Sequence, residues 1–219
     1  MELLIVIAII AVLSVILVLI LDPGEILKKS RDSQRMSDLA TMKMALGLYS
    51  VSTTSPIMAG ASNAGCKGNT SSDTIYAAGD KIYYSLGIET ALTNGTTIDG
   101  ATAVSSTLTP GQVTSTSTGK VDGTGWLPVN IASLMGGSPI SNLPVDPTNT
   151  VATAAAPKST DLVYRYVCSE KTLKYEIAAV LESNAFTVAD NRMAKDGGNN
   201  AAYYEVGTDL TLLGTGTDF

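Results

Sequence analysis

A long apolar run at the N-terminus constrains this chain more than any other feature. Residues 3–21 read LLIVIAIIAVLSVILVLIL, nineteen residues without a charge, and only Ala8, Ala11 and Ser14 are not Leu, Ile or Val. As a helix with a rise of about 1.5 Å per residue, the run is roughly 28 Å long, close to the roughly 30 Å hydrocarbon core of a bilayer. The run therefore predicts a helix that is able to cross a membrane.

The residues that flank the run separate three explanations of it. A cleaved secretory signal usually has a basic start and a small-residue cleavage site, whereas Glu2 precedes this run and Asp22-Pro23-Gly24 follows it. A plain membrane anchor accounts for the run but gives Glu2 no role. The third explanation is a helix through which subunits assemble, and it comes from a family resemblance.

Residues 1–33, MELLIVIAIIAVLSVILVLILDPGEILKKSRDS, resemble the N-terminus of type IV pilins and type II secretion pseudopilins. In that family a segment ending in Glu leads into an apolar stretch, through which the subunits polymerise. The resemblance implies that Glu2 pairs with the terminal ammonium of a neighbouring subunit and sets the axial register. A solvated Glu2, favoured by the helix dipole, is the alternative. The assembly residues implied for this chain are Glu2, Leu3, Leu4, Ile5, Ile7, Ile10, Leu13, Pro23 and Gly24.

A second helical pattern follows after a break. Pro23 and Gly24 disfavour helix, which predicts a kink or a locally melted stretch near residues 22–24. From Glu25 on, apolar residues recur at spacings of three and four, which predicts an amphipathic helix that ends near residues 50–56. Its buried face is expected to carry Ile26, Leu27, Met36, Leu39, Met42, Leu46 and Tyr49, and its solvated face the cations Lys28, Lys29, Arg31 and Arg35. The N-terminal helix thus covers residues 1–53, with 1–22 as its transmembrane or filament-core part.

Residues 54–219 are expected to form one globular head with an antiparallel sheet towards its C-terminus. Residues 162–168 and 172–181 alternate around a short turn, which predicts a β-hairpin, and residues 202–206 predict a further strand. The amphipathic helix is expected to cover one face of a sheet of three or four strands. The fold class is therefore α+β, a long N-terminal α-helical spine packed on an antiparallel β-sheet, which the resemblance identifies with the pilin fold.

The middle of the chain gives weaker signals. Residues 52–125 are rich in Ser, Thr, Gly and Ala and predict loops and short elements, with residues 82–84 as one strand-like run. Trp126 lies between turn signals and is interpreted as a core anchor. Asn69 and Asn94 begin N-glycosylation patterns, a weak signal because so short a pattern recurs by chance.

The two cysteines of the chain, Cys66 and Cys168, are too few for a structural zinc site and suit one disulfide in an oxidising compartment. Cys168 falls late in a predicted strand, and a bond to Cys66 would close a very long loop, which stabilises the fold in the chain-entropy model. Two free thiols are the alternative.

Composition disfavours several classes of function. With 14 basic and 20 acidic residues, the chain lacks the positive surface of a general nucleic-acid binder. It has no histidine, no nucleophile elbow and no phosphate loop, so we expect neither an enzyme nor a cofactor. Residues 190–200 are rich in oxygen ligands that calcium prefers, but their spacing is not that of an EF-hand, so a solvated turn is expected and no metal site.

Together with the resemblance, these features favour a structural subunit of a type IV pilus-like extracellular filament that serves adhesion, motility or DNA uptake. The partners implied are copies of the chain in a helical homopolymer, a prepilin peptidase and a pilus assembly platform. The subunit is expected in the inner membrane before assembly and on the cell surface afterwards. A pseudopilin of a type II secretion system is the alternative, and a membrane-anchored surface enzyme is disfavoured.

Overall fold

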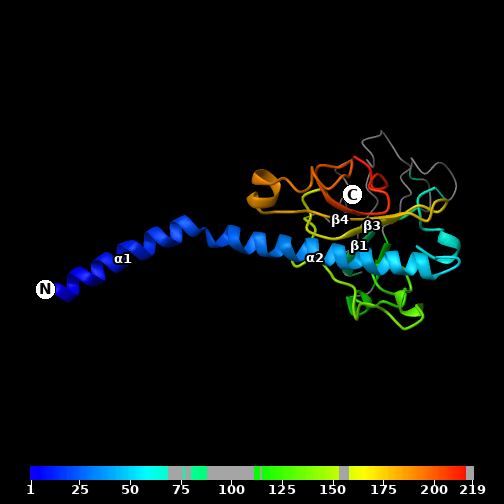
Figure 1. The fold of residues 1–219 in the computed structure, drawn as a ribbon, viewed down its shortest axis with the longest axis horizontal. Helices are drawn as coiled ribbons and strands as arrows, with labels where there is room; N and C mark the ends of the chain where they lie inside the picture. Colours follow the sequence, from blue (N-terminus) through cyan, green and yellow to red (C-terminus); the bar gives the residue numbers. More distant parts are fainter. Residues whose placement is uncertain (69–75, 77–79, 88–110, 114, 153–157, 216–219) are drawn as a thin grey trace.

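The computed structural model describes residues 1–68, 76, 80–87, 111–113, 115–152 and 158–215, without the side chains of residues 18–21 and 111–115. Two helices follow one another, α1 (Glu2–Leu21) and α2 (Pro23–Ser52). The second half of α2 lies along a head that contains the sheet, whereas α1 projects away from the head (Figure 1). Helix α1 and the start of α2 make the elongated end of the molecule (Figure 1).

The break between the helices is confined to one residue. Asp22 has a left-handed backbone, with φ 38° and ψ 78°, and its Oδ1 accepts a hydrogen bond from the Glu25 N–H at 3.3 Å. Pro23 is the first residue of α2, where the missing N–H of proline costs no helical hydrogen bond. A Cβ on Gly24 would lie 3.3 Å from Asp22 Oδ1, so glycine leaves room for this cap. The sequence Asp-Pro-Gly thus caps a new helix and does not melt it.

The sheet has five strands in the order β2-β1-β3-β4-β5. Strands β1, β3, β4 and β5 pair antiparallel, as expected, whereas β2 joins the edge of the sheet parallel to β1. The parallel edge strand was not predicted, because it lies in the stretch that predicts loops. The strands are β1 (Tyr83–Gly87), β2 (Gly111–Val113), β3 (Arg165–Cys168), β4 (Tyr175–Ala179) and β5 (Tyr204–Gly207). Short helical turns are η1 (Ala61–Asn63), η2 (Ser115–Ser117), η3 (Ile131–Ser133) and η4 (Ala185–Ala189).

The hairpin of β3 and β4 is confirmed, although its second strand begins later than the alternation predicts. Leu173 has a positive φ of 53°, which belongs to a turn and not to a strand. The N–H of Ser169 donates to the carbonyl oxygen of Lys174 at 2.8 Å and closes this turn. Pairing of β4 therefore starts at Tyr175.

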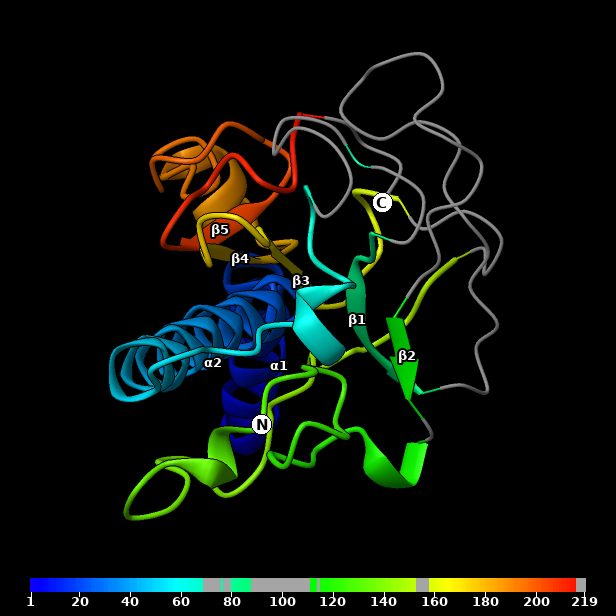
Figure 2. The same cartoon turned by 90° about the vertical axis from the view of Figure 1, so that its right-hand side faces the viewer.

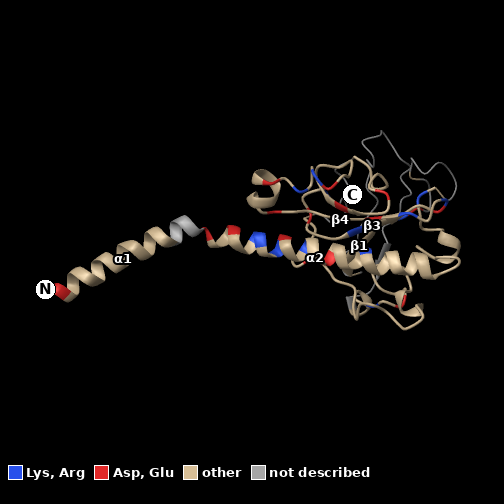
Figure 3. Ribbon diagram, in the orientation of Figure 1, with Lys and Arg blue, Asp and Glu red and all other residues tan. Residues whose placement is uncertain are grey.

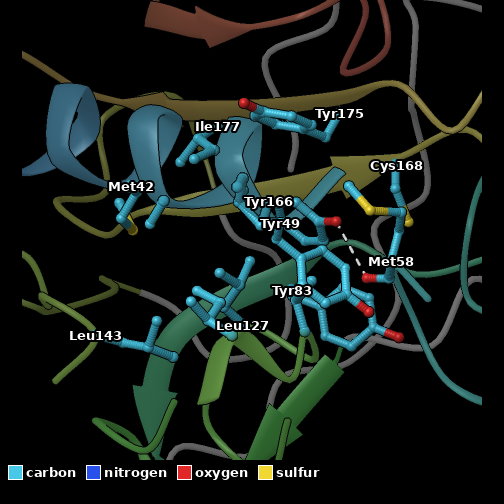
Figure 4. Close-up of a cluster of buried hydrophobic side chains, with 14 of the residues drawn as sticks. Met42, Tyr49, Met58, Tyr83, Leu127, Leu143, Tyr166, Cys168, Tyr175 and Ile177 are labelled. Atoms are coloured by element: carbon cyan, nitrogen blue, oxygen red, sulfur yellow. Dashed lines mark hydrogen bonds between the residues drawn. The ribbon is translucent and has the colours of Figure 1, made fainter. Parts of the chain in front are cut away.

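One face of the sheet packs against α2 and forms the larger core (Figure 4). Leu39, Met42 and Leu46 of α2 are fully buried there against Tyr166 and Ile177 of the sheet. This bears out the predicted apolar face in the second half of α2. Loops after the sheet's first strands complete this core with Trp126, which is fully buried as predicted and donates its indole N–H to the Pro144 carbonyl oxygen at 2.8 Å.

The other face of the sheet is covered by the end of the chain. Leu212 and Leu213 are buried against Val167, Ala178 and Tyr203 in a second, smaller core. Figure 2 shows the sheet between α2 on one side and the C-terminal segment, in red, on the other. Both faces of the sheet are therefore closed.

A disulfide joins Cys66 and Cys168, as predicted, with an S–S distance of 2.03 Å. It ties the segment after α2 to the end of β3, across 102 residues of sequence. The two glycosylation candidates, Asn69 and Asn94, lie outside the described residues.

Replacing both cysteines by alanine is expected to lower the free energy of unfolding by about 3 to 5 kcal/mol, because the unfolded chain regains the entropy of a long open loop. Urea denaturation of the oxidised wild type and of the double variant measures this difference. The reduced wild type serves as the control and should match the variant. A loss below about 1 kcal/mol would show that the cross-link contributes little.

Candidate assembly surface

Helix α1 presents apolar side chains on all sides, and they are exposed. Leu3, Leu4, Ile5 and Val6 follow one another at about 100° around the helix, and they are 75%, 63%, 61% and 51% exposed. Charge is absent from the helix after Glu2 until Asp22 (Figure 3). A helix that is apolar all round is ordinarily buried in a large core or in lipid, so the surface of α1 is suited to contacts beyond its own chain.

The structure places Glu2 and the apolar members of the predicted assembly set on α1. Glu2 opens α1 at its free end, and the other apolar members of the set are exposed along it. They are Leu3, Leu4, Ile5, Ile7, Ile10 and Leu13. Pro23 and Gly24 stand apart from them, at the exposed start of α2. Within the part of the chain that is described, no helix combines the length and the hydropathy of a membrane span.

The first turns of α2 correct the sequence prediction. Ile26 and Leu27 are 53% and 60% exposed, although the spacing placed them on the buried face. They lie on the part of α2 that extends beyond the sheet (Figure 1), so no core is available to cover them. Exposed apolar side chains are therefore present on both sides of the joint.

Arg35 is a second correction, because the sequence placed it on a solvated face and the structure buries it completely. Its Nε and Nη2 donate to the two carboxylate oxygens of Asp146 at 2.7 and 2.9 Å, a bidentate pair. Its Nη1 donates to Asp32 and to Glu182, both at 2.8 Å. One guanidinium thus joins α2 to two distant segments of the head.

Asp32 contributes more than a charge to this cluster. Its carboxylate accepts hydrogen bonds from the backbone N–H groups of Glu182 and Ser183, the shortest at 2.8 Å. These two residues leave β4 and start the η4 loop, so Asp32 holds the end of the sheet against α2. Asp146 has a similar double role, because its Oδ1 also accepts the Thr148 N–H at 2.8 Å and shapes the turn around it.

Arg31 completes the cluster at its solvent edge. Its Nε and Nη2 donate to both oxygens of Glu182 at 2.6 and 2.8 Å. This hydrogen bond, and then that of Arg35, lower the pKa of Glu182 to about 2. Burial alone would lower the pKa of Arg35, but its bonds to Asp146, Glu182 and Asp32 outweigh this and raise the pKa. The cluster thus brings together two guanidinium groups and three acidic side chains.

Two tyrosines add hydrogen bonds between α2 and the sheet. The Tyr164 hydroxyl donates to Asp38 at 2.8 Å, and the Tyr175 hydroxyl donates to the Lys43 carbonyl oxygen at 2.9 Å. Burial raises the pKa of Asp38, an effect that the Tyr164 bond opposes. The second half of α2 is thus bonded to the head at several points, whereas the one side-chain hydrogen bond of α1 among the described residues is within the helix, from Ser14 to Ile10.

The oxygen-rich loop at residues 190–200 uses its carboxylates internally. Asp190 pairs with Arg192 and Lys195 at 2.6 and 2.7 Å, and Asp196 accepts backbone N–H groups from Gly198 and Glu205. Among the residues that the structure describes, no group of three or more acidic or cysteine side chains is arranged to hold a metal ion.

Comparisons of this chain with protein-family models, with curated proteins and with solved structures find no match. Function is therefore inferred from the residues and their geometry.

Substituting Arg35 by alanine is expected to destabilise the head by about 3 to 5 kcal/mol, because it leaves buried carboxylates without their cation. Chemical denaturation of the full chain in detergent measures the change. Lys43→Ala, which removes an exposed cation from the same helix, is the matched control and should cost less than about 0.5 kcal/mol. Equal effects of the two variants would contradict a special role for the buried cluster.

The lowered pKa of Glu182 predicts a specific sensitivity to acid. A carboxylate whose pKa is depressed in the folded state stabilises the fold above its unfolded pKa of about 4.3, and this stabilisation is lost as the pH falls towards 2. Between pH 6 and pH 3, the wild type should lose about 1 kcal/mol more than Glu182→Gln, a figure reduced for the partial exposure of this side chain. Urea midpoints at both pH values test this, and equal losses would contradict it.

Proposed function

We propose that this chain is a structural subunit of a type IV pilus-like extracellular filament, assembled through α1. The observation that supports the proposal best is the exposed, uncharged surface of α1, which the folded head leaves uncovered. A second copy of the same helix offers a matching apolar surface. A helical homopolymer covers α1 on every side, which a pair of subunits cannot do.

The energetics of this assembly favour helix packing. Moving a Leu, Ile or Val side chain from water into an apolar environment gains about 1.5 to 3 kcal/mol, so sixteen such residues in 3–21 supply a large driving force against solvent. From a membrane, the gain is smaller, because lipid is as apolar as leucine, and it comes from close packing and from hydrogen bonds between helices. Assembly from the inner membrane therefore needs a precise fit, which an assembly platform would guide.

In this proposal, Glu2 sets the axial position of each subunit relative to its neighbours. A carboxylate at the end of an apolar helix is costly within a bundle of such helices unless it has a cationic partner. The terminal ammonium of a neighbouring subunit, freed by a prepilin peptidase, is the partner that the family resemblance suggests. Mispositioned subunits would leave Glu2 unpaired, so the charge selects one axial offset.

The head is non-enzymatic in this proposal and decorates the filament surface, where adhesion, motility or DNA uptake take place. Its disulfide suits an oxidising location outside the cytoplasm. Both faces of the sheet are closed within the chain, so the head is able to fold before α1 finds its neighbours.

Placing an arginine in the middle of α1, as Ile10→Arg, is expected to reduce surface filaments more than tenfold, because a charge within the helix bundle has no partner. Negative-stain electron microscopy and immunoblots of sheared filaments measure the loss. Met135→Arg, the same change on a fully exposed head residue, is the matched control and should assemble normally.

Two results would contradict the proposal. One is filaments of normal number and length from Ile10→Arg subunits that retain the Cys66–Cys168 disulfide. The other is a wild-type chain that remains monomeric when the assembly machinery is present. Filaments that grow only as short stubs, together with a block in protein export, would indicate the pseudopilin alternative.

A further inference from the structure

Two glutamates lie side by side on the sheet face that points away from α2. Glu176 is on β4 and Glu205 on β5, and they are 0% and 1% exposed. In the register of these strands, Glu176 lies opposite Gly207 and Glu205 opposite Ala178, which makes the two carboxyl groups diagonal neighbours on one face. Buried acidic side chains are rare unless they are paired with a cation or protonated.

Each carboxyl group uses one oxygen to hold a neighbouring segment. Oε2 of Glu176 accepts the N–H of Leu213 at 2.9 Å, and Oε2 of Glu205 accepts the N–H of Asn200 at 3.1 Å. The backbone of Gly198 packs against the Glu205 carboxyl so closely that a Cβ there would overlap it. The pair therefore holds both the loop before β5 and the C-terminal segment.

The other oxygen of each carboxyl group has no hydrogen bond to a donor in the part of the chain that the structure describes. Oε1 of Glu176 and Oε1 of Glu205 are both buried and find no hydrogen-bond donor among the described residues. Two ionised carboxylates are acceptors only, so a hydrogen bond between these groups requires a proton on one of them. A hydrogen bond between the side chains of Glu176 and Glu205 adds to burial in raising the pKa of Glu205.

The charged groups around the pair come from three other elements. Burial raises the pKa of Glu176, an effect that the charge of Lys67, next to the disulfide, opposes. The Lys67 ammonium donates to the Leu212 carbonyl oxygen at 2.9 Å. Asp196, in the loop before β5, adds a like charge near Glu205. Arg165 on β3 faces the same side of the sheet and donates to carbonyl oxygens, the closest that of Lys158 at 2.7 Å. Tyr76 also donates to Leu212.

We propose that Glu176 and Glu205 share one proton and that this pair is a proton-dependent latch for residues 208–215, the C-terminal segment that covers the second face of the sheet. Glu205 carries the proton and donates it to Glu176, whose charge Lys67 favours. When the segment lifts, water reaches both carboxyl groups and the proton is released. Opening of the latch is therefore easier at higher pH.

The direction of this pH dependence follows from the difference in bound protons between the closed and the open state. Burial raises the pKa of Glu205, and the hydrogen bond and the charge of Glu176 raise it further. A group with a raised pKa in the closed state contributes stability that is complete below its open-state pKa of about 4.3 and is lost as the pH rises. Between pH 5.5 and 7.5 the closed latch holds one proton more than the open one, so the opening equilibrium should rise by about tenfold per pH unit.

Amide hydrogen exchange in the full chain, held in detergent micelles, tests the latch. After correction for the intrinsic exchange rate, the protection of the Leu213 and Asn200 amides in the wild type should fall by about tenfold per pH unit from 5.5 to 7.5. Amides of α2 in the same sample should show no such slope. This measurement uses the wild type alone, so misfolding of a variant does not affect it.

Glu205→Gln keeps the shape of the side chain and a donor that does not titrate. Its Leu213 amide should show protection that no longer depends on pH and that exceeds the wild type at pH 7.5. Glu170→Gln, at the turn between β3 and β4, is the matched control and should keep the wild-type slope. The proposal would be overturned if the protection of the Leu213 amide in the wild type did not change with pH. It would also be overturned if this protection changed equally with pH in the wild type and in Glu205→Gln. Protection that disappears with a chelator and returns with calcium would overturn it too, because a metal ion would then hold the pair.

Discussion

The buried guanidinium of Arg35 fixes the rest of the molecule in place. A charge with no exposure requires partners from every direction, and its partners Asp146 and Glu182 lie 111 and 147 residues further along the chain. Because one planar group meets both, α2 has a single rotation and a single axial position at which the cluster is complete. Apolar packing of Leu39 and Leu46 would tolerate small slips, so the ionic cluster supplies the precision and the apolar core supplies most of the free energy.

The two faces of the sheet are covered in different ways. Towards α2, tyrosines and aliphatic side chains build the larger core, and their hydroxyl groups reach polar atoms at its rim, as Tyr166 does with the Met58 carbonyl oxygen at 3.1 Å (Figure 4). On the opposite face, the cover is the irregular end of the chain, which has backbone groups that no neighbouring strand pairs. Polar side chains such as Glu176 and Lys67 satisfy those groups, which explains why so many of them are buried there.

Sequence patterns predict those features that depend on neighbours in the chain. The spacing of Leu39, Met42 and Leu46, the hairpin before and after Ser169, and the disulfide follow from local periodicity or from counting. The exposure of Ile26 does not follow from local periodicity, because it depends on how far the head extends along α2. The burial of Arg35 was missed because basic residues on a helix are usually solvated, although the spacing of Asp32 and Arg35, three apart, already allowed an ion pair. Their distant partners are set by tertiary structure alone.

The joint at Asp22 connects α1, the proposed assembly surface, to the part of the molecule that Arg35 holds in place. The hydrogen bond from the Glu25 N–H ties the Asp22 side chain to α2, but it does not restrain the φ torsion of Asp22, so α1 is able to change direction relative to α2 without losing this bond. Load carried by α1 in a filament would pass through that cap into α2, and from α2 through the Arg35 cluster into the sheet. Contacts of α1 bury apolar surface without a strong directional preference, whereas those of Arg35 are directional and buried. The head would therefore keep its position on α2 while α1 adapts to its neighbours.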